Sequence, residues 1–147
     1  MEMELKSQAF ENGEKIPTKY TCNGEGIIPP MEIDGVPAKA RSLALVVDDP
    51  DAPSGTFVHW LVWNIDPKVK EIKEDAKRVG VKGINDAGGI GYTPPCPPRG
   101  PSHTYRFRVY ALDIMLDLKS GADVPQLEAA MEGHVLAQAK LDGEFGR

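Results

Sequence analysis

The sequence lacks an apolar run long enough to cross a bilayer. Its longest one, residues 57–63, has the length of a strand and is interrupted by His59, whereas a membrane helix needs about 20 apolar residues. The chain also lacks a charged-then-apolar leader, because residues 1–4 alternate methionine and glutamate. These absences predict a cytoplasmic protein without integral membrane contact.

Clusters of basic side chains are also missing. The chain carries 17 Lys and Arg against 22 Asp and Glu, which gives a formal net charge of -5 at pH 7. A nucleic-acid surface requires concentrated positive charge. We therefore predict no nucleic-acid partner and no polybasic face for anionic lipid.

Cysteine and histidine are scarce, with Cys22 and Cys96 as the two cysteines and three histidines in all. Two cysteines do not make a disulfide framework, and neither residue type has the short paired spacing of a zinc site. Cytosolic thiols are normally reduced, so reduced cysteines are expected, although both lie in turn-rich segments that could approach each other. We predict no metal and no cofactor.

Proline and glycine are, in contrast, plentiful, with 13 and 15 among 147 residues. Both interrupt regular elements and favour turns, so a β-rich chain of short elements is expected. The length suits a single domain over residues 1–147, and no linker, repeat or low-complexity segment divides it.

Three segments have the pattern of strands. Residues 42–48 form a continuous apolar run, and residues 57–65 are apolar on both sides, which is typical of strands buried on both faces. Under strict alternation, His59 shares a face with the other odd-numbered residues of its segment. Residues 105–111 alternate apolar and basic side chains, like an antiparallel strand with one exposed face. The charged residues 66–82 are expected to form a solvated connection.

One helix is predicted near the end of the chain. Asp123 and Gln126 have the spacing of a capping box, and Pro125 suits the first helical turn. Apolar residues at helical spacing continue past His134, which we assign to the packed face, and Gly143 ends the helix. The predicted fold class is mainly β, a sandwich of antiparallel sheets with one C-terminal helix and few short helical turns.

Two proline-rich segments carry the most informative side chains. Residues 48–53 supply carboxylates ahead of His59, and residues 91–102 lead directly into His103. Proline fixes φ and forces its predecessor into an extended conformation, so these segments are stiff loops. A loop that is ordered before its ligand arrives loses less entropy on binding. Two such loops, each followed by a histidine, predict a convergent binding pocket.

These segments resemble the two signature regions of the phosphatidylethanolamine-binding protein (PEBP) family, which includes the Raf kinase inhibitor proteins. The first reads Asp-Pro-Asp-Ala-Pro and then His59-Trp60, and the second reads Gly-x-x-x-Pro-Cys-Pro-Pro-x-Gly-x-x-His-x-Tyr and ends at Tyr105. Residues 10–24 and 35–45 resemble the short prokaryotic branch of the family. The resemblance implies a PEBP-like β-sandwich.

In the family, an aspartate, two histidines and a tyrosine line a small anion-binding pocket, and the resemblance carries these roles to matching positions. The implied ligand-binding residues are Asp49, His59, Pro95, Cys96, Pro97, Gly100, His103 and Tyr105, with Asp51 and Trp60 in support. A carboxylate beside a histidine favours its charged form. We therefore expect Asp49 to position and charge His59 or His103, and Tyr105 to add a neutral O–H donor.

These residues also have structural interpretations. Aspartates next to prolines commonly bond local backbone N–H groups, and a histidine on an apolar strand is often simply buried. No serine, threonine or cysteine lies in a known nucleophile motif.

We predict a non-enzymatic protein that binds a small anion or a phospholipid headgroup and has a regulatory or inhibitory role. Two alternatives stay open. One is inhibition of a serine protease through a surface loop, with a protease or a kinase as the protein partner. The other is a hydrolase that uses the His, Tyr and Asp side chains as acid and base.

The sequence departs from the family pattern near the site. Thr104 stands where the family usually has arginine, and the tryptophan often found shortly before residues 35–37 is missing. The sequence ends at Arg147 without the longer segment that closes the pocket in mammalian members. We therefore expect an open pocket mouth, or one covered by a second subunit, and predict a homodimer.

Overall fold

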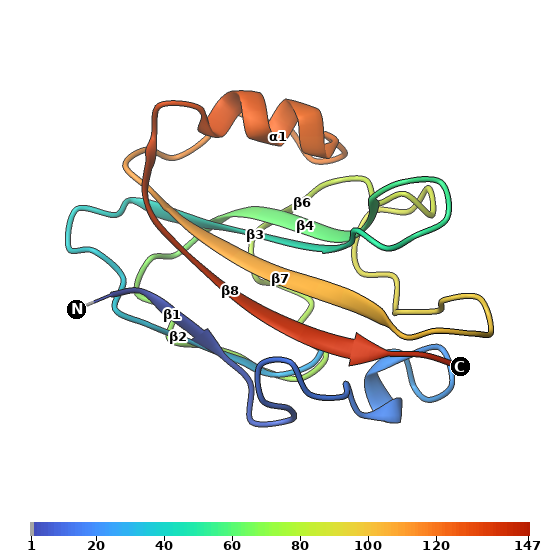
Figure 1. The fold of residues 1–147 in the computed structure, drawn as a ribbon. Helices are drawn as coiled ribbons and strands as arrows, with labels where there is room; N and C mark the ends of the chain where they lie inside the picture. The colour runs from blue at the N-terminus through green and yellow to red at the C-terminus, as the bar shows by residue number, and fades with distance from the viewer. Residues whose placement is uncertain (1) are drawn as a thin grey trace.

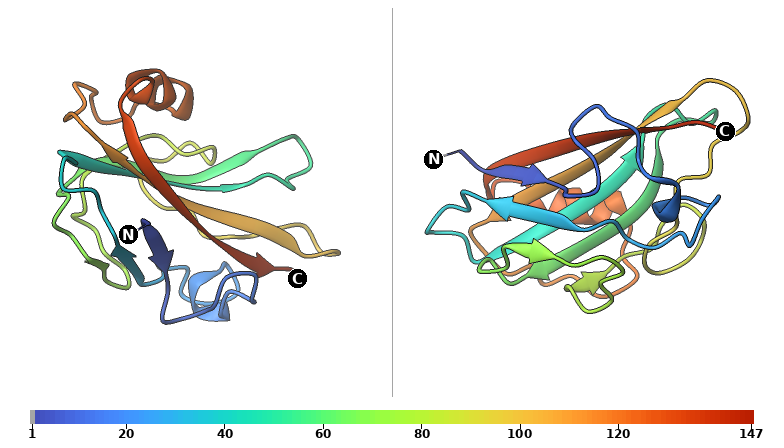
Figure 2. Two further views of the ribbon diagram at one scale, coloured as in Figure 1. Left: turned by 60° about the vertical axis from the view of Figure 1, so that its left-hand side comes forward. Right: turned by 90° about the horizontal axis from the view of Figure 1, so that it is seen from below.

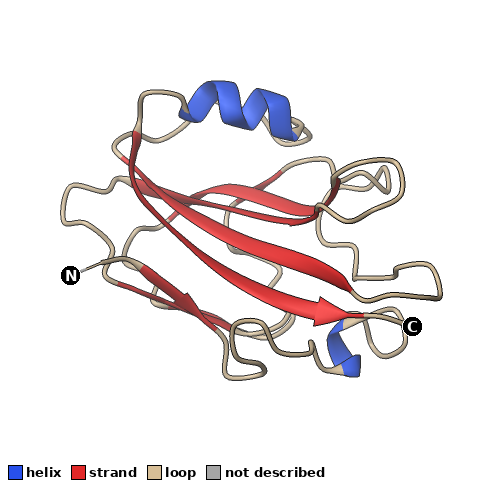
Figure 3. Ribbon diagram, in the orientation of Figure 1, coloured by secondary structure: helices blue, strands red, loops and turns tan. Residues whose placement is uncertain are grey.

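A five-stranded antiparallel sheet with the order β6-β4-β3-β7-β8 forms the centre of the computed structural model, which describes residues 2–147 (Figure 1). Its strands are β3 (Ser42–Asp49), β4 (Phe57–Ile65), β6 (Val81–Lys82), β7 (His103–Leu112) and β8 (Val135–Phe145). A smaller antiparallel sheet contains β1 (Glu4–Lys6), β2 (Met31–Asp34) and β5 (Glu71–Ile72). The helical elements are the 3-10 turn η1 (Thr18–Tyr20) and helix α1 (Val124–Met131) (Figure 3).

The small sheet and α1 cover opposite faces of the large sheet (Figure 2). Strand β3 is therefore buried on both sides, with Leu43 and Leu45 packed between the sheets and Ala44 and Val46 packed under α1. Full burial of one such leucine or valine contributes about 1.5–3 kcal/mol to folding. The mainly β sandwich with one helix is confirmed.

Strand β7 alternates as predicted. Phe107 and Val109 are completely buried between the sheets, while Arg106 and Arg108 lie on the other face. That face is not simply solvated, because both arginines donate to the buried carboxylate of Asp48, at 2.8 and 2.6 Å. An ion-pair cluster therefore covers this part of the sheet.

Strand β4 carries a β-bulge that strict alternation does not foresee. Val47 pairs with Trp60 and Asp48 pairs with Val58, which leaves His59 as an extra residue. A bulge shifts the side chains that follow it by one position, here as far as the second register shift of this strand pair, between Leu43 and Leu45. The prediction that His59 shares a face with Leu61 was therefore wrong, because Leu61 packs under α1.

The start of the predicted helix is confirmed. Asp123 accepts a hydrogen bond from the Gln126 backbone N–H at 2.9 Å, and the Gln126 side chain accepts from the Asp123 N–H at 3.0 Å. This reciprocal pair satisfies two N–H groups that have no partner inside the helix.

The predicted end of the helix was wrong. Helix α1 stops at Met131, Gly133 adopts a left-handed φ of 81°, and β8 then pairs with β7 along almost its whole length. Ala137 and Leu141 face the core with a period of two, which outweighs the helical spacing. His134 lies in the turn before β8, where its Nδ1 donates to Asp113 at 2.8 Å, so its assignment to the helix face was also wrong.

The connection over residues 66–82 is more ordered than expected. It contributes β5 to the small sheet and β6 to the edge of the large one. Across residues 2–147, no helix has the length and apolar character needed to cross a membrane.

Candidate functional site

The two proline-rich loops meet beside the ends of β3, β4 and β7 and enclose a cavity of about 190 Å³. Its walls are formed by Asp49, Ala52, Pro53, Phe57, His59, Thr93, Pro94, Cys96, Pro97, Pro98, His103 and Tyr105. All the predicted ligand-binding residues except Pro95 and Gly100 are among them. Pockets for drug-sized molecules are usually 300–1,000 Å³, so this cavity has room only for a smaller molecule.

Asp49 holds His103 in a fixed orientation. His103 Nδ1 donates to one carboxylate oxygen at 2.6 Å, and the Asp51 backbone N–H donates to the other at 2.8 Å. Asp49 is almost fully buried, and both of its oxygens have partners. With Nδ1 carrying the shared hydrogen, His103 has Nε2 free for a ligand.

His59 is held by backbone rather than by a carboxylate. Its Nδ1 donates to the Thr93 carbonyl at 2.8 Å, and the Thr93 N–H donates to the His59 carbonyl at 2.9 Å. Burial lowers the pKa of His59, and this outweighs the opposing effects of the Thr93 hydrogen bond and of Asp49. Of the two histidines that we expected Asp49 to position, it therefore holds His103, and the lowered pKa keeps His59 neutral near pH 7.

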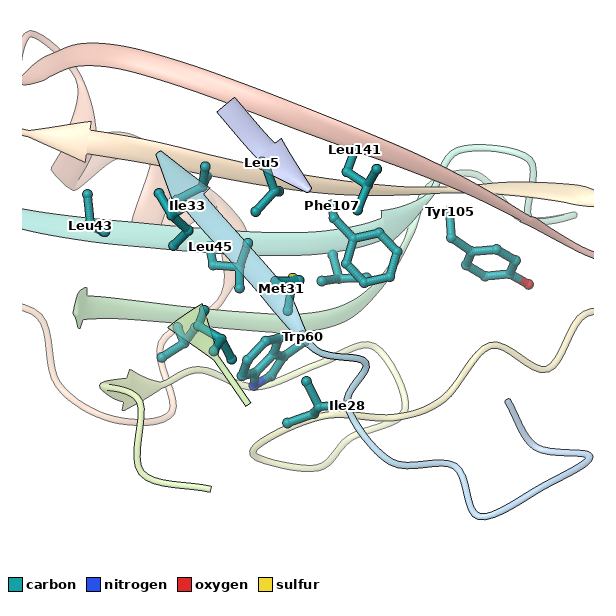
Figure 4. Packing of buried hydrophobic residues seen from close by; sticks show 14 of the residues in the cluster. Leu5, Ile28, Met31, Ile33, Leu43, Leu45, Trp60, Tyr105, Phe107 and Leu141 are labelled. Carbon is teal, nitrogen blue, oxygen red and sulfur yellow. The ribbon is translucent and has the colours of Figure 1, made fainter. Parts of the chain in front are cut away.

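Tyr105 lies two residues beyond His103, so both side chains are on the same face of β7. The centroid of its ring lies 5.3 Å from the centroid of the His59 ring and 6.4 Å from that of the His103 ring. Figure 4 shows its hydroxyl directed away from the other labelled core residues. Burial raises the pKa of Tyr105, and the charge of Asp49 and a hydrogen bond to its carboxylate raise it further. Tyr105 therefore keeps its proton, and its hydroxyl lies within reach of Asp49 as well as of the cavity.

A disulfide joins Cys22 and Cys96, with 5.3 Å between their Cα atoms. The expectation of reduced thiols was wrong, because the fold brings two turn-rich segments together that are far apart in the sequence. Pro95 lies outside the cavity and supports the same junction, where its carbonyl accepts from the Cys22 N–H at 3.0 Å. The disulfide thus fixes the second proline-rich loop to the region around η1.

The remaining predicted residues support the walls. Asp51 accepts from the Thr104 N–H at 2.8 Å and so anchors the start of β7. Gly100 donates its N–H to the Arg147 carbonyl at 3.2 Å. Trp60 lies on the far side of the bulge, where it packs edge-on against Tyr92.

Thr104, which replaces the usual arginine, donates its hydroxyl to Glu144 at 2.8 Å. This hydrogen bond joins β7 to β8 at that position.

The prediction from sequence did not include some of the wall residues. Phe57 packs 4.9 Å from the His59 ring, and its place two residues before the histidine is a signal that strand alternation could have revealed. Thr93 contributes its backbone carbonyl, for which no side-chain signal exists. Within residues 2–147, no three His, Cys, Asp or Glu side chains are grouped in a way that could hold a metal ion.

The family model for phosphatidylethanolamine-binding protein matches residues 6–146. This chain belongs to the PEBP family. A PEBP homologue from Chlamydia trachomatis has a crystal structure similar to this one, with a TM-score of 0.96 at 46% identity over 99% of this chain and 98% of that one. Escherichia coli YbcL, a member of the mammalian PEBP family, gives a TM-score of 0.92 at 29% identity over 100% and 99%.

A UPF0098 protein of Methanothermobacter thermautotrophicus is 50% identical over 99% of both chains. The family predicted from the two proline-rich motifs, including its short prokaryotic branch, is confirmed.

Proposed function

We propose that this PEBP-family protein binds a small phosphate-containing ligand, such as a phospholipid headgroup, in the cavity beside His103, and that binding serves a regulatory or inhibitory role. The observation that carries the proposal is the convergence of a carboxylate-oriented histidine and a buried tyrosine hydroxyl on a cavity of about 190 Å³. Stiff loops form the cavity, so little entropy is lost when a ligand arrives.

The donors differ in what they offer. Tyr105 gives a neutral O–H, and His103 offers Nε2, which donates when the ring is protonated. The neutral His59 can accept a hydrogen bond from a ligand hydroxyl or from a protonated phosphate oxygen. The negative charge of Asp49 repels an anion, so simple inorganic phosphate should bind weakly.

The test is a titration of ¹⁵N-labelled protein with phosphate, phosphorylethanolamine and acetate. We expect localised shifts in the Thr93 and Gly100 amides of the wild type that disappear in His103→Ala. His134→Ala is the matched control, because His134 has the same kind of carboxylate partner away from the cavity. An absence of shifts at millimolar ligand would refute the proposal.

The Asp49–His103 pair also favours a second candidate, acid–base hydrolysis, because an oriented imidazole is a common general base. Against this candidate, the cavity wall within residues 2–147 contains no serine, and its cysteine is disulfide-bonded. We propose binding without turnover. Release of inorganic phosphate from phosphorylethanolamine, followed by ³¹P NMR and lost in His103→Ala, would favour the hydrolase instead.

The protein partners stay predictions from the family resemblance. A kinase or a serine protease bound through a remote surface loop should still bind after His103→Ala, whereas a partner recognised through the cavity should not. We also propose a homodimer, and light scattering that gives the monomer mass of 16.0 kDa at micromolar concentration would refute it.

The cytoplasmic location is also a proposal, and the disulfide is the observation that weighs against it. Disulfides persist mainly in oxidising compartments. Thiol trapping in freshly lysed cells would test the location. A Cys22–Cys96 pair that resists alkylation is disulfide-bonded and would indicate an oxidising compartment.

A further inference from the structure

The proposed anion has no cationic partner in the cavity wall, which contains neither lysine nor arginine among the described residues 2–147. Arg147 lies beside this wall. Its Nε donates to the carbonyl oxygen of Pro97 at 2.7 Å, and Pro97 is one of the wall residues. The guanidinium therefore contacts a residue of the cavity wall.

The backbone fixes Arg147 at this place. His103 pairs with Phe145 at the end of the β7–β8 ladder, and the Arg147 carbonyl accepts the Gly100 N–H at 3.2 Å. The chain after β8 therefore continues alongside the second proline-rich loop, as Figures 1 and 2 also show. Phe145 is buried at the end of this ladder, and Arg147 follows it two residues later.

The guanidinium retains unused donors. An arginine has five N–H groups, and Nε accounts for one of them. Within residues 2–147, Arg147 forms no ion pair with a carboxylate, whereas Arg106 and Arg108 both bind Asp48. The positive charge of Arg147 also acts on the cavity residue Tyr105. Burial and Asp49 raise the pKa of Tyr105, whereas Arg147 lowers it.

We propose that Arg147 supplies the cationic contact at the mouth of the cavity and selects doubly charged phosphate monoesters over singly charged carboxylates. A guanidinium binds phosphate through two parallel N–H donors, and charge-assisted bonds of this kind are about twice as strong as neutral ones. The second charge of a monoester gains more from this contact than a carboxylate does. The proposal rests on anion binding in the cavity as proposed above.

The test compares Arg147→Gln with Arg99→Gln, a control that removes an arginine from the second proline-rich loop itself, at a position outside the cavity wall. Affinities for phosphorylethanolamine and acetate are measured by NMR titration of each protein. In Arg147→Gln we expect a loss of about tenfold or more for phosphorylethanolamine, as for one charge-assisted hydrogen bond. Acetate should change by less than about threefold. Arg99→Gln should bind both ligands like the wild type.

Arg147→Lys separates charge from geometry. A lysine keeps the charge but lacks the planar fork, so part of the phosphorylethanolamine affinity should return. The Gly100 amide shift reports the position of the loop in every variant. Equal losses for both ligands together with a moved Gly100 amide would mean that Arg147 only positions the loop, which overturns the inference. Unchanged phosphorylethanolamine binding in Arg147→Gln also overturns it and leaves the proposed function intact, whereas failure of the wild type to bind overturns both.

Discussion

Asp48 and Asp49 are neighbours at the end of β3, and each is 3% exposed, yet they lie in opposite environments. Asp48 points to the face of the large sheet that α1 covers, where Arg106 and Arg108 neutralise it with fixed charges. Asp49 points into the cavity, where its side-chain partner is His103, a group that can gain or lose a proton. Alternation along one strand thus separates a structural carboxylate, Asp48, from one that faces the cavity, Asp49.

The two sides also differ in how their loops are held. On the side of Asp49, the Cys22–Cys96 disulfide closes a loop with a sequence separation of 74. On the side of Asp48, ion pairs and the packing of α1 serve that role. Burial alone therefore does not identify a site, because the partner of each buried charge decides its role.

The largest effect should follow from removing the disulfide. A cross-link of this span stabilises a protein by about 4 kcal/mol in the chain-entropy model. Cys22→Ser with Cys96→Ser should lower the urea midpoint by a corresponding amount and broaden the Gly100 and Thr93 amide signals, while amides around Asp48 stay sharp. Uniform broadening on both sides would contradict the distinction between them.

Next in size is the loss of the structural carboxylate. Asp48→Asn leaves two arginines without their counter-charge, and because each arginine is about one-third exposed we expect a destabilisation of about 2 kcal/mol rather than the larger cost of a fully buried pair. Urea unfolding measures this loss. Phosphorylethanolamine affinity of the folded variant should equal that of the wild type, and Asp113→Asn, at an exposed His pair, serves as the control for charge removal.

Substitution of the neighbouring Asp49 should instead weaken ligand binding. Asp49→Ala releases His103 Nδ1, so phosphorylethanolamine binding should weaken by about tenfold, the value of one lost charge-assisted contact. Asp49→Asn keeps an acceptor oxygen and should retain more of the affinity. Calorimetric titration of both variants decides the point, and tighter binding by Asp49→Ala would show that repulsion outweighs positioning.

The smallest effect concerns pH. Burial lowers the pKa of His59 in the folded protein, so below the ordinary histidine pKa of about 6.5 the unfolded chain binds more protons than the folded one. Stability should fall as the pH drops through this range, by at most about 1.4 kcal/mol per pH unit. His59→Gln should flatten this part of the curve of unfolding free energy against pH. An unchanged slope would assign the acid sensitivity to another group.

The proline-rich loops could be predicted from sequence because their stiffness is local. Proline acts on its own φ and on the preceding residue, so the positions of Asp49 and His103 relative to their strands needed no tertiary information. The alternation of β7 was readable for the same reason, because a period of two is independent of the partner strand.

Features that depend on pairing could not be predicted in this way. The bulge at His59 exists only in the register between β3 and β4, and the Cys22–Cys96 disulfide requires two loops to meet. The prediction that the helix continues past Met131 was wrong because the apolar side chains of residues 135–145 fit both a helical period and a strand period of two. Pairing with β7 makes this segment a strand.

The residues of the cavity wall are far apart in the sequence, and this affects when the cavity can form during synthesis. Asp49 and His103 belong to the wall, and Cys22 is joined to the wall residue Cys96 by the disulfide. Strand β8, the last strand in the sequence, pairs with β7. A chain still emerging from the ribosome can form the β3–β4 pair early, but it lacks the cavity until β7 has left the exit tunnel. Ligand therefore cannot guide the first stages of synthesis, and any gain in stability from binding comes after the sheet has closed.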